Sequence, residues 1–74
     1  MTVEIELFGQ LLPGKSRRQT LEMERPLNVQ DVALRLGLNP KEIGLMTING
    51  VQSELDELVP PKCRLCFFPH MFGG

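Results

Sequence analysis

Apolar and polar residues alternate at the start of the chain. Val3, Ile5 and Leu7 are separated by glutamates, which is the period-two pattern of a strand with one buried face. The same pattern returns at Leu21 and Met23, after a turn marked by glycine and proline. We therefore predict a β-hairpin. Glutamates alternate with the apolar residues in both strands, so like charges would face each other unless a basic residue intervenes, and the register stays open.

A helix is predicted next. Asn28 is a favourable N-cap, and four apolar residues then recur at the i, i+3, i+4 and i+7 spacing of one helix face. They are Val29, Val32, Ala33 and Leu36. Gly37 suits the left-handed position that ends a helix, and Pro40 prevents the helix from continuing. The spacing predicts one amphipathic helix of about ten residues.

The second half of the chain predicts three more strands. Residues 45–48 are apolar except for Thr47, and the Asn49-Gly50 pair that follows is a strong signal for a tight hairpin turn. Residues 51–53 would return as a short strand. Residues 54–58 carry two leucines at helical spacing and predict one turn of helix. Residues 63–68 alternate again and predict a last strand.

The order of elements is therefore β-β-α-β-β-β, in which residues 1–68 form one α+β domain and residues 69–74 an extended tail. The 74 residues include eight basic and nine acidic ones, for a formal net charge of −1, which gives no electrostatic footprint for nucleic acid. No apolar run approaches the roughly 20 residues of a membrane span, and the first residues do not resemble a signal peptide. The expected partners exclude nucleic acid and membrane, and the expected compartment is the cytoplasm.

Few residues offer catalytic chemistry. The chain has one histidine, no glycine-rich phosphate loop and no cluster with metal-ligand spacing, so we expect a protein substrate or binding module rather than an enzyme, with no bound metal or cofactor. Cys63 and Cys66 form a Cys-x-x-Cys pair, but a structural zinc site needs four ligands. On a strand these positions face opposite sides, so we predict one core and one surface cysteine.

Two polar features have competing interpretations. Lys15, Arg17 and Arg18 lie near the expected hairpin tip and fit a solvated loop better than a docking site for an acidic partner. His70 would contact a nucleotide phosphate or a partner in one interpretation, but a lone histidine in a tail fits an incidental residue better.

The last residues are the main candidate for function. Gly73 and Gly74 have no Cβ atoms, so this segment can thread a channel that excludes bulkier residues and present a terminal carboxylate. Pro69 fixes its own φ and favours an extended Phe68. Residues 69–74 would reach roughly 20 Å when fully extended. The alternative interpretation is that these residues form a frayed chain end without a role.

Three large apolar residues stand at or beyond the last strand, where a small core cannot bury all of them. They are Phe68, Met71 and Phe72. Exposed apolar groups that cluster usually mark a partner surface. We therefore predict that these residues, together with Pro69, contact a partner protein.

The order of elements resembles the β-grasp, or ubiquitin-like, fold, with a mixed sheet and one helix packed across it. A more specific resemblance is to the MoaD/ThiS family of small sulfur carriers, above all to the small subunit of molybdopterin synthase. Ile48-Asn49-Gly50, Leu58 and the ending from Phe67-Phe68-Pro69 to Gly73-Gly74 carry this resemblance. The chain departs from the family pattern at Pro60-Pro61-Lys62, at His70 in place of a second proline, and at Phe72 in place of a small residue.

The resemblance implies a function for the diglycine. In the family, a ubiquitin-activating-type adenylyltransferase uses ATP to convert the terminal carboxylate to an acyl-adenylate, and a persulfide sulfur donor then displaces AMP. Gly74 would carry the resulting thiocarboxylate, with Gly73 providing passage. The recipient would be a biosynthetic enzyme such as the large subunit of molybdopterin synthase. Open alternatives are a thiamine-pathway or other sulfur carrier, a protein modifier joined to lysines through Gly74, and a binding module with a passive diglycine.

Overall fold

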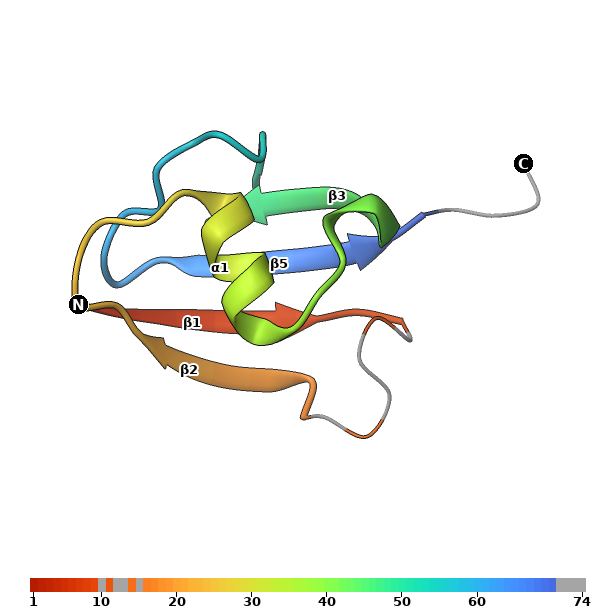
Figure 1. Cartoon of the computed structure of the whole chain (residues 1–74), viewed down its shortest axis with the longest axis horizontal. Helices are drawn as coiled ribbons and strands as arrows, with labels where there is room; N and C mark the ends of the chain where they lie inside the picture. Colours follow the sequence, from red (N-terminus) through yellow and green to blue (C-terminus); the bar gives the residue numbers. More distant parts are fainter. Residues whose placement is uncertain (10, 12–13, 15, 71–74) are drawn as a thin grey trace.

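The computed structural model describes residues 1–9, 11, 14 and 16–70, which form one sheet and two helical segments (Figure 1). The elements are β1 (Thr2–Leu7), β2 (Arg18–Glu22), α1 (Val29–Leu36), the short 3₁₀ helix η1 (Pro40–Glu42), β3 (Ile43–Ile48), β4 (Val51–Ser53) and β5 (Arg64–Pro69). This is the predicted α+β order, β-β-α-β-β-β.

The five strands are arranged in the order β2-β1-β5-β3-β4. The last strand of the chain is thus the central strand of the sheet. β5 pairs in parallel with β1 and antiparallel with β3, and both hairpins are antiparallel. The sheet is therefore mixed, and α1 lies across one of its faces (Figure 1). This arrangement is the β-grasp fold that the order of elements predicts.

The core lies between α1 and the sheet. Val3, Ile5, Leu65 and Phe67 project from β1 and β5, and each is at most 1% exposed. Of the predicted apolar face of α1, Val29, Val32 and Ala33 are fully buried in the same cluster, and Leu36 is partly buried against it. Each of the larger side chains contributes about 1.5–3 kcal/mol through its removal from water. The alternation in β1 and β5 thus assigns one face of the sheet to the core.

The two caps of α1 are those that the sequence predicts. The Asn28 side chain accepts a hydrogen bond from the Asp31 N–H at 2.8 Å. Gly37 adopts a left-handed conformation with φ 90°, and its N–H donates to the Leu34 carbonyl. This conformation ends the helix at the expected residue, and α1 has eight residues where about ten were expected.

The β1–β2 hairpin resolves the open question of register. Glu4 lies opposite Thr20 and Glu6 opposite Arg18, so the glutamates of the two strands do not face each other. β2 covers Arg18–Glu22, earlier in the chain than the alternation of Leu21 and Met23 suggests. Met23 is nevertheless buried, just beyond the end of the strand.

The predicted helical turn over residues 54–58 is wrong. Residues 55 and 56 form a turn, and Leu58 makes an isolated bridge with Asn28. The carbonyls of Leu55 and Glu57 accept hydrogen bonds from backbone N–H groups at the start of α1, at 2.9 Å each. The segment thus supplies acceptors for these otherwise unpaired donors, and within it a single tight turn is closed by the Glu57 N–H, which donates to the Glu54 carbonyl at 3.2 Å.

The Asn49-Gly50 turn forms as predicted, with positive φ at both residues (52° and 83°). Asn49 also reaches across to the central strand. Its N–H donates to the Arg64 carbonyl at 2.8 Å, and its side-chain oxygen accepts from the Arg64 N–H at 3.0 Å. The β3–β4 hairpin is thereby tied to the start of β5.

Candidate functional site

Of the predicted site residues, two lie at the end of β5 and are described by the structure. Phe68 and Pro69 are half-buried and belong to β5, so Pro69 is part of the sheet instead of the first residue of the tail. The other four predicted residues lie outside the described part of the chain. They are Met71, Phe72, Gly73 and Gly74. The described part of the candidate site is thus the place where the chain leaves β5 and the sheet surface beside it.

Pro69 lies between two glycines from the neighbouring strands. A Cβ atom on Gly9, which follows β1, would stand 2.7 Å from the Pro69 ring. A Cβ atom on Gly44, in β3, would stand 2.7 Å from the Pro69 carbonyl oxygen and 2.8 Å from the His70 Cα. Side-chain atoms cannot occupy such distances, so both positions admit the end of β5 because they carry none.

His70 is held against the fold, which differs from the expectation of an incidental tail residue. Its Nε2 atom lies 2.8 Å from the backbone carbonyl oxygen of Lys41 in η1. Because a carbonyl accepts, Nε2 carries the proton of this bond. The histidine therefore connects the residue after β5 to the residues before β3.

Phe68 stacks on Phe8, a residue that the sequence analysis did not include in the site. The ring centroids lie 4.5 Å apart and the ring planes differ by 7°. The register of β5 places Leu45 of β3 on the other flank of Phe68. All three side chains are half-buried and lie on the sheet face opposite α1. The alternation of β1 puts Phe8 on this face, but its position beside Phe68 required the β1–β5 pairing.

The basic residues near the hairpin tip make specific contacts. The Arg17 guanidinium lies 5.6 Å from the centroid of the Phe8 ring, within cation–π range. The Arg18 side chain is 3.7 Å from a carboxylate oxygen of Glu6. Both arginines are exposed. The prediction of a solvated loop is therefore incomplete for Arg17 and Arg18, while Lys15 lies outside the described residues.

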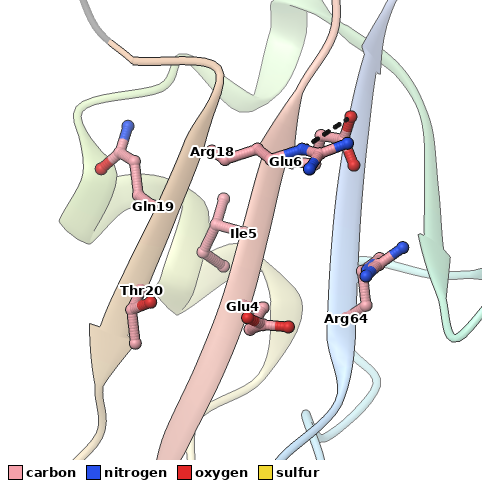
Figure 2. A pocket seen from close by; sticks show the side chains of 7 residues that line it. All are labelled: Glu4, Ile5, Glu6, Arg18, Gln19, Thr20 and Arg64. Atoms are coloured by element: carbon pink, nitrogen blue, oxygen red, sulfur yellow. Dashed lines mark ion pairs between the residues drawn. The ribbon is translucent and has the colours of Figure 1, made fainter.

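The open face of the sheet carries a shallow groove beside the aromatic stack. Figure 2 shows its charged part, where Glu4, Glu6, Arg18 and Arg64 project from β1, β2 and β5. A second hollow continues over Cys66 to Phe8 and Phe68. The face thus changes from charged to apolar in the direction in which β5 runs.

Both cysteines are buried and free. Cys63 faces the core and is 2% exposed, and burial raises the pKa of its thiol. Cys66 faces the open side of the sheet but is 9% exposed. The prediction of one surface cysteine is therefore wrong in burial, although the two residues do lie on opposite faces. The register places Cys66 between Glu6 and Thr47 of the flanking strands.

The described residues contain no group of three histidine, cysteine or carboxylate side chains placed to hold a metal ion. No helix in this part of the chain is long and apolar enough to cross a membrane.

The mixed sheet with a single helix across it defines a small protein of the ubiquitin-like β-grasp class. Among solved structures, the chain is similar to SAMP1 from Haloferax volcanii, a ubiquitin-like small archaeal modifier protein. The TM-score is 0.78 at 23% sequence identity, and the match covers 100% of both chains. This similarity establishes the fold, and the protein that it matches is a modifier rather than an enzyme. No protein-family model matches the chain, and no curated protein matches it by sequence.

Proposed function

We propose that the protein is a ubiquitin-like sulfur carrier whose Gly74 carboxylate is adenylated and then converted to a thiocarboxylate. The observation that carries this proposal is the position of Gly73-Gly74, shortly beyond the central strand of a β-grasp sheet. A glycyl carbonyl has no side chain beside it, so it is the least hindered acyl group that a protein can offer. The reactive group would stand on a narrow arm that continues from the central strand.

The proposed chemistry proceeds in three steps. An oxygen of the Gly74 carboxylate attacks the α-phosphorus of ATP, pyrophosphate leaves, and an acyl-adenylate forms. The terminal sulfur of a persulfide donor then attacks the acyl carbon, and AMP leaves. A thiol cleaves the S–S bond of the acyl disulfide, which releases the thiocarboxylate and leaves the donor sulfur in a disulfide with that thiol. ATP is bound by the partner enzyme, and the carrier itself holds no cofactor.

In this role the protein is a co-substrate of three partners in the cytoplasm. They are a ubiquitin-activating-type adenylyltransferase, a sulfur donor, and a biosynthetic enzyme that accepts the sulfur. A molybdopterin synthase large subunit is the acceptor that we propose first, and a thiamine-pathway enzyme is the alternative. A carrier without acid–base residues at its reactive end depends on these partners for every chemical step.

The surface for these partners would surround the end of β5. Phe8, Phe68 and Leu45 form an apolar patch there, next to Pro69 at the end of β5. Met71 and Phe72 would extend the patch along the tail. Half-buried aromatic side chains are efficient contacts because they bury a large area with few rotatable bonds.

Intact-mass measurement tests the proposal. The protein isolated from its native cells should end at Gly74, because the carboxylate of this residue is the reactive group. Incubation with the adenylyltransferase of the same cells, ATP and a persulfide donor should add the mass of one oxygen-to-sulfur exchange. A protein that ends elsewhere, or that stays unmodified with every such enzyme of its cells, contradicts the proposal.

Two variants locate the reaction at Gly74. Deletion of Gly74, or one alanine appended after it, should abolish the mass change while thermal unfolding stays the same. Gly14→Ala is a matched control for a loss of stability alone, because the φ of 85° strains an alanine there while no atom lies within 4 Å of the added Cβ. The control should be converted as fast as the wild type.

A second candidate function is that of a protein modifier joined to lysines through Gly74. The similarity to SAMP1, itself a modifier, supports this alternative. Both functions require the acyl-adenylate and differ in the product. Isopeptide-linked forms on target proteins, seen as a ladder that requires Gly74, would favour the modifier, whereas a free thiocarboxylate would favour the carrier.

A further inference from the structure

The end of β5 is constrained more closely than pairing within a sheet requires. Pro69 pairs with Ile43, which is 7% exposed and belongs to the core. The register shifts between Ile43 and Leu45, so Gly44 lies in an irregular step of β3. At this step the backbone of Gly44 approaches the Pro69–His70 peptide closely enough to exclude a Cβ atom. The last peptide of the described chain therefore has little freedom to shift sideways.

The hydrogen bond of His70 adds a constraint from a different element. Its acceptor, the Lys41 carbonyl, belongs to η1. Asn39 caps this short helix, and its side-chain oxygen accepts from the Lys41 N–H at 3.0 Å. The Glu42 N–H donates to the Asn39 carbonyl at 2.9 Å. The backbone N–H groups before and after the Lys41 carbonyl are thus both hydrogen-bonded to Asn39, so this carbonyl is an acceptor of fixed position.

These contacts converge on two consecutive residues. Gly9 and Gly44 contact Pro69 from the two strands that flank β5, and η1 holds the ring of His70. A residue restrained in this way fixes the point from which the tail starts, because the Pro69–His70 peptide and the His70 ring are both held. We name the contacts of Gly44 and Lys41 with residues 69 and 70 the exit clamp.

We propose that His70 is a positioning residue for the reaction at Gly74, because its bond to the Lys41 carbonyl holds the start of the tail in the exit clamp. This inference rests on the proposed function. A tail that starts from a fixed point loses less conformational freedom when it enters an active site. His70 thus acts before binding, and its contribution belongs to the KM of the activating enzyme for the carrier rather than to kcat.

Substitutions at position 70 test the bond. His70→Gln keeps an N–H donor at nearly the reach of Nε2, whereas His70→Asn is polar but too short, and His70→Ala has no donor. In ATP–pyrophosphate exchange by the adenylyltransferase of the same cells, H70A and H70N should raise KM about fivefold, the equivalent of one ordinary hydrogen bond. H70Q should restore KM to near the wild-type value. kcat and the melting temperature should stay the same in all three.

A second measurement tests the exit clamp in the free protein, without any enzyme. The NMR order parameter of the residue-70 amide should fall in H70A and H70N and stay high in H70Q. An unchanged order parameter, or an unchanged KM in variants whose order parameter has fallen, overturns the proposal. If the wild type supports no exchange with any adenylyltransferase of its cells, the proposed function fails, and the role of His70 in it fails as well. The order parameters then still decide whether the exit clamp exists.

Discussion

The rings of Phe8 and Phe68 stack in parallel on the open face of the sheet, with their centroids 4.5 Å apart. They come from opposite ends of the chain and meet because β1 and β5 pair in parallel. The Arg17 guanidinium lies over the Phe8 ring. This group of three side chains lies where the central strand ends, so it links the apolar part of the open face to the start of the tail.

The stack should stabilise the fold and support partner binding. A double-mutant cycle of Phe8→Ala and Phe68→Ala, measured by urea unfolding, should give a coupling free energy of about 1 kcal/mol. Phe8→Ala should also weaken binding to the adenylyltransferase. Leu34→Ala is the matched control, because Leu34 is a large apolar residue that is 55% exposed on α1. Equal loss of binding in both variants would contradict a docking role for the stack.

Gly44→Ala should disturb the exit of the chain. Gly44 has no positive φ, so alanine causes no intrinsic backbone strain there, and the effect comes from the added Cβ atom 2.7 Å from the Pro69 carbonyl oxygen. Overpacking of this kind costs about 1–3 kcal/mol in the free energy of unfolding.

Chemical shifts separate this effect from a general loss of stability. Gly44→Ala should shift the amide signal of His70. Gly50→Ala, at a residue with φ 83° and open space around it, should destabilise the protein without moving that signal. Equal shifts in the two variants would mean that Gly44 does not control the exit.

Three substitutions of Asn49 separate its two contributions. Asn49→Gly keeps the positive φ but loses the acceptor for the Arg64 N–H, so it should cost about 1 kcal/mol in unfolding free energy. Asn49→Ala loses the acceptor and also the tolerance of a positive φ, so it should cost about 1–2 kcal/mol more than Asn49→Gly. Asn49→Asp keeps the acceptor. Amide exchange at Arg64 should quicken in N49G and N49A but not in N49D, and uniform rates across the three would rule out the side-chain bond.

The buried thiol of Cys63 predicts a dependence of stability on pH. Burial raises the pKa of this thiol in the folded protein, so the folded state holds its proton more tightly than the unfolded state does. The associated stability is fully present below the pKa of the unfolded thiol and is lost as the pH rises toward the pKa of the folded thiol. Unfolding free energy should therefore fall above about pH 9.

Cys63→Ala is the control for this dependence, because it removes the ionisable group. Its unfolding free energy should decline less steeply over the same alkaline range. Native protein should also react slowly with iodoacetamide at both cysteines, because both are buried. Rapid alkylation of native Cys63 would contradict its burial.

The sequence predicted correctly those features that depend on residues close together along the chain. Asn28 and Gly37 cap α1, and Asn49-Gly50 forms a turn, because each acts through bonds and dihedrals within a few residues. The buried faces of β1 and β5 followed from alternation alone. These local features were enough to establish the order of elements and the class of fold.

The errors arose from contacts between distant segments. Residues 54–58 do not form a helical turn, and two of their carbonyls accept instead from the first N–H groups of α1. Cys66 is buried by the strands on both sides of β5, which no local pattern reveals. The pairing of Phe8 with Phe68 and of His70 with Lys41 likewise depends on which strands become neighbours. The chemistry predicted for Gly73 and Gly74 lies outside the described residues and stays a prediction.

The central position of β5 also has a consequence for biosynthesis. β1–β2 and β3–β4 form two separate hairpins, and β5 alone joins them into one sheet. During translation both hairpins are made before residues 64–69, so the sheet cannot close until synthesis has reached the base of the tail. Chains released early would lack the strand that holds the hairpins together and would be exposed to proteolysis. Folding would then select for chains that have reached Pro69.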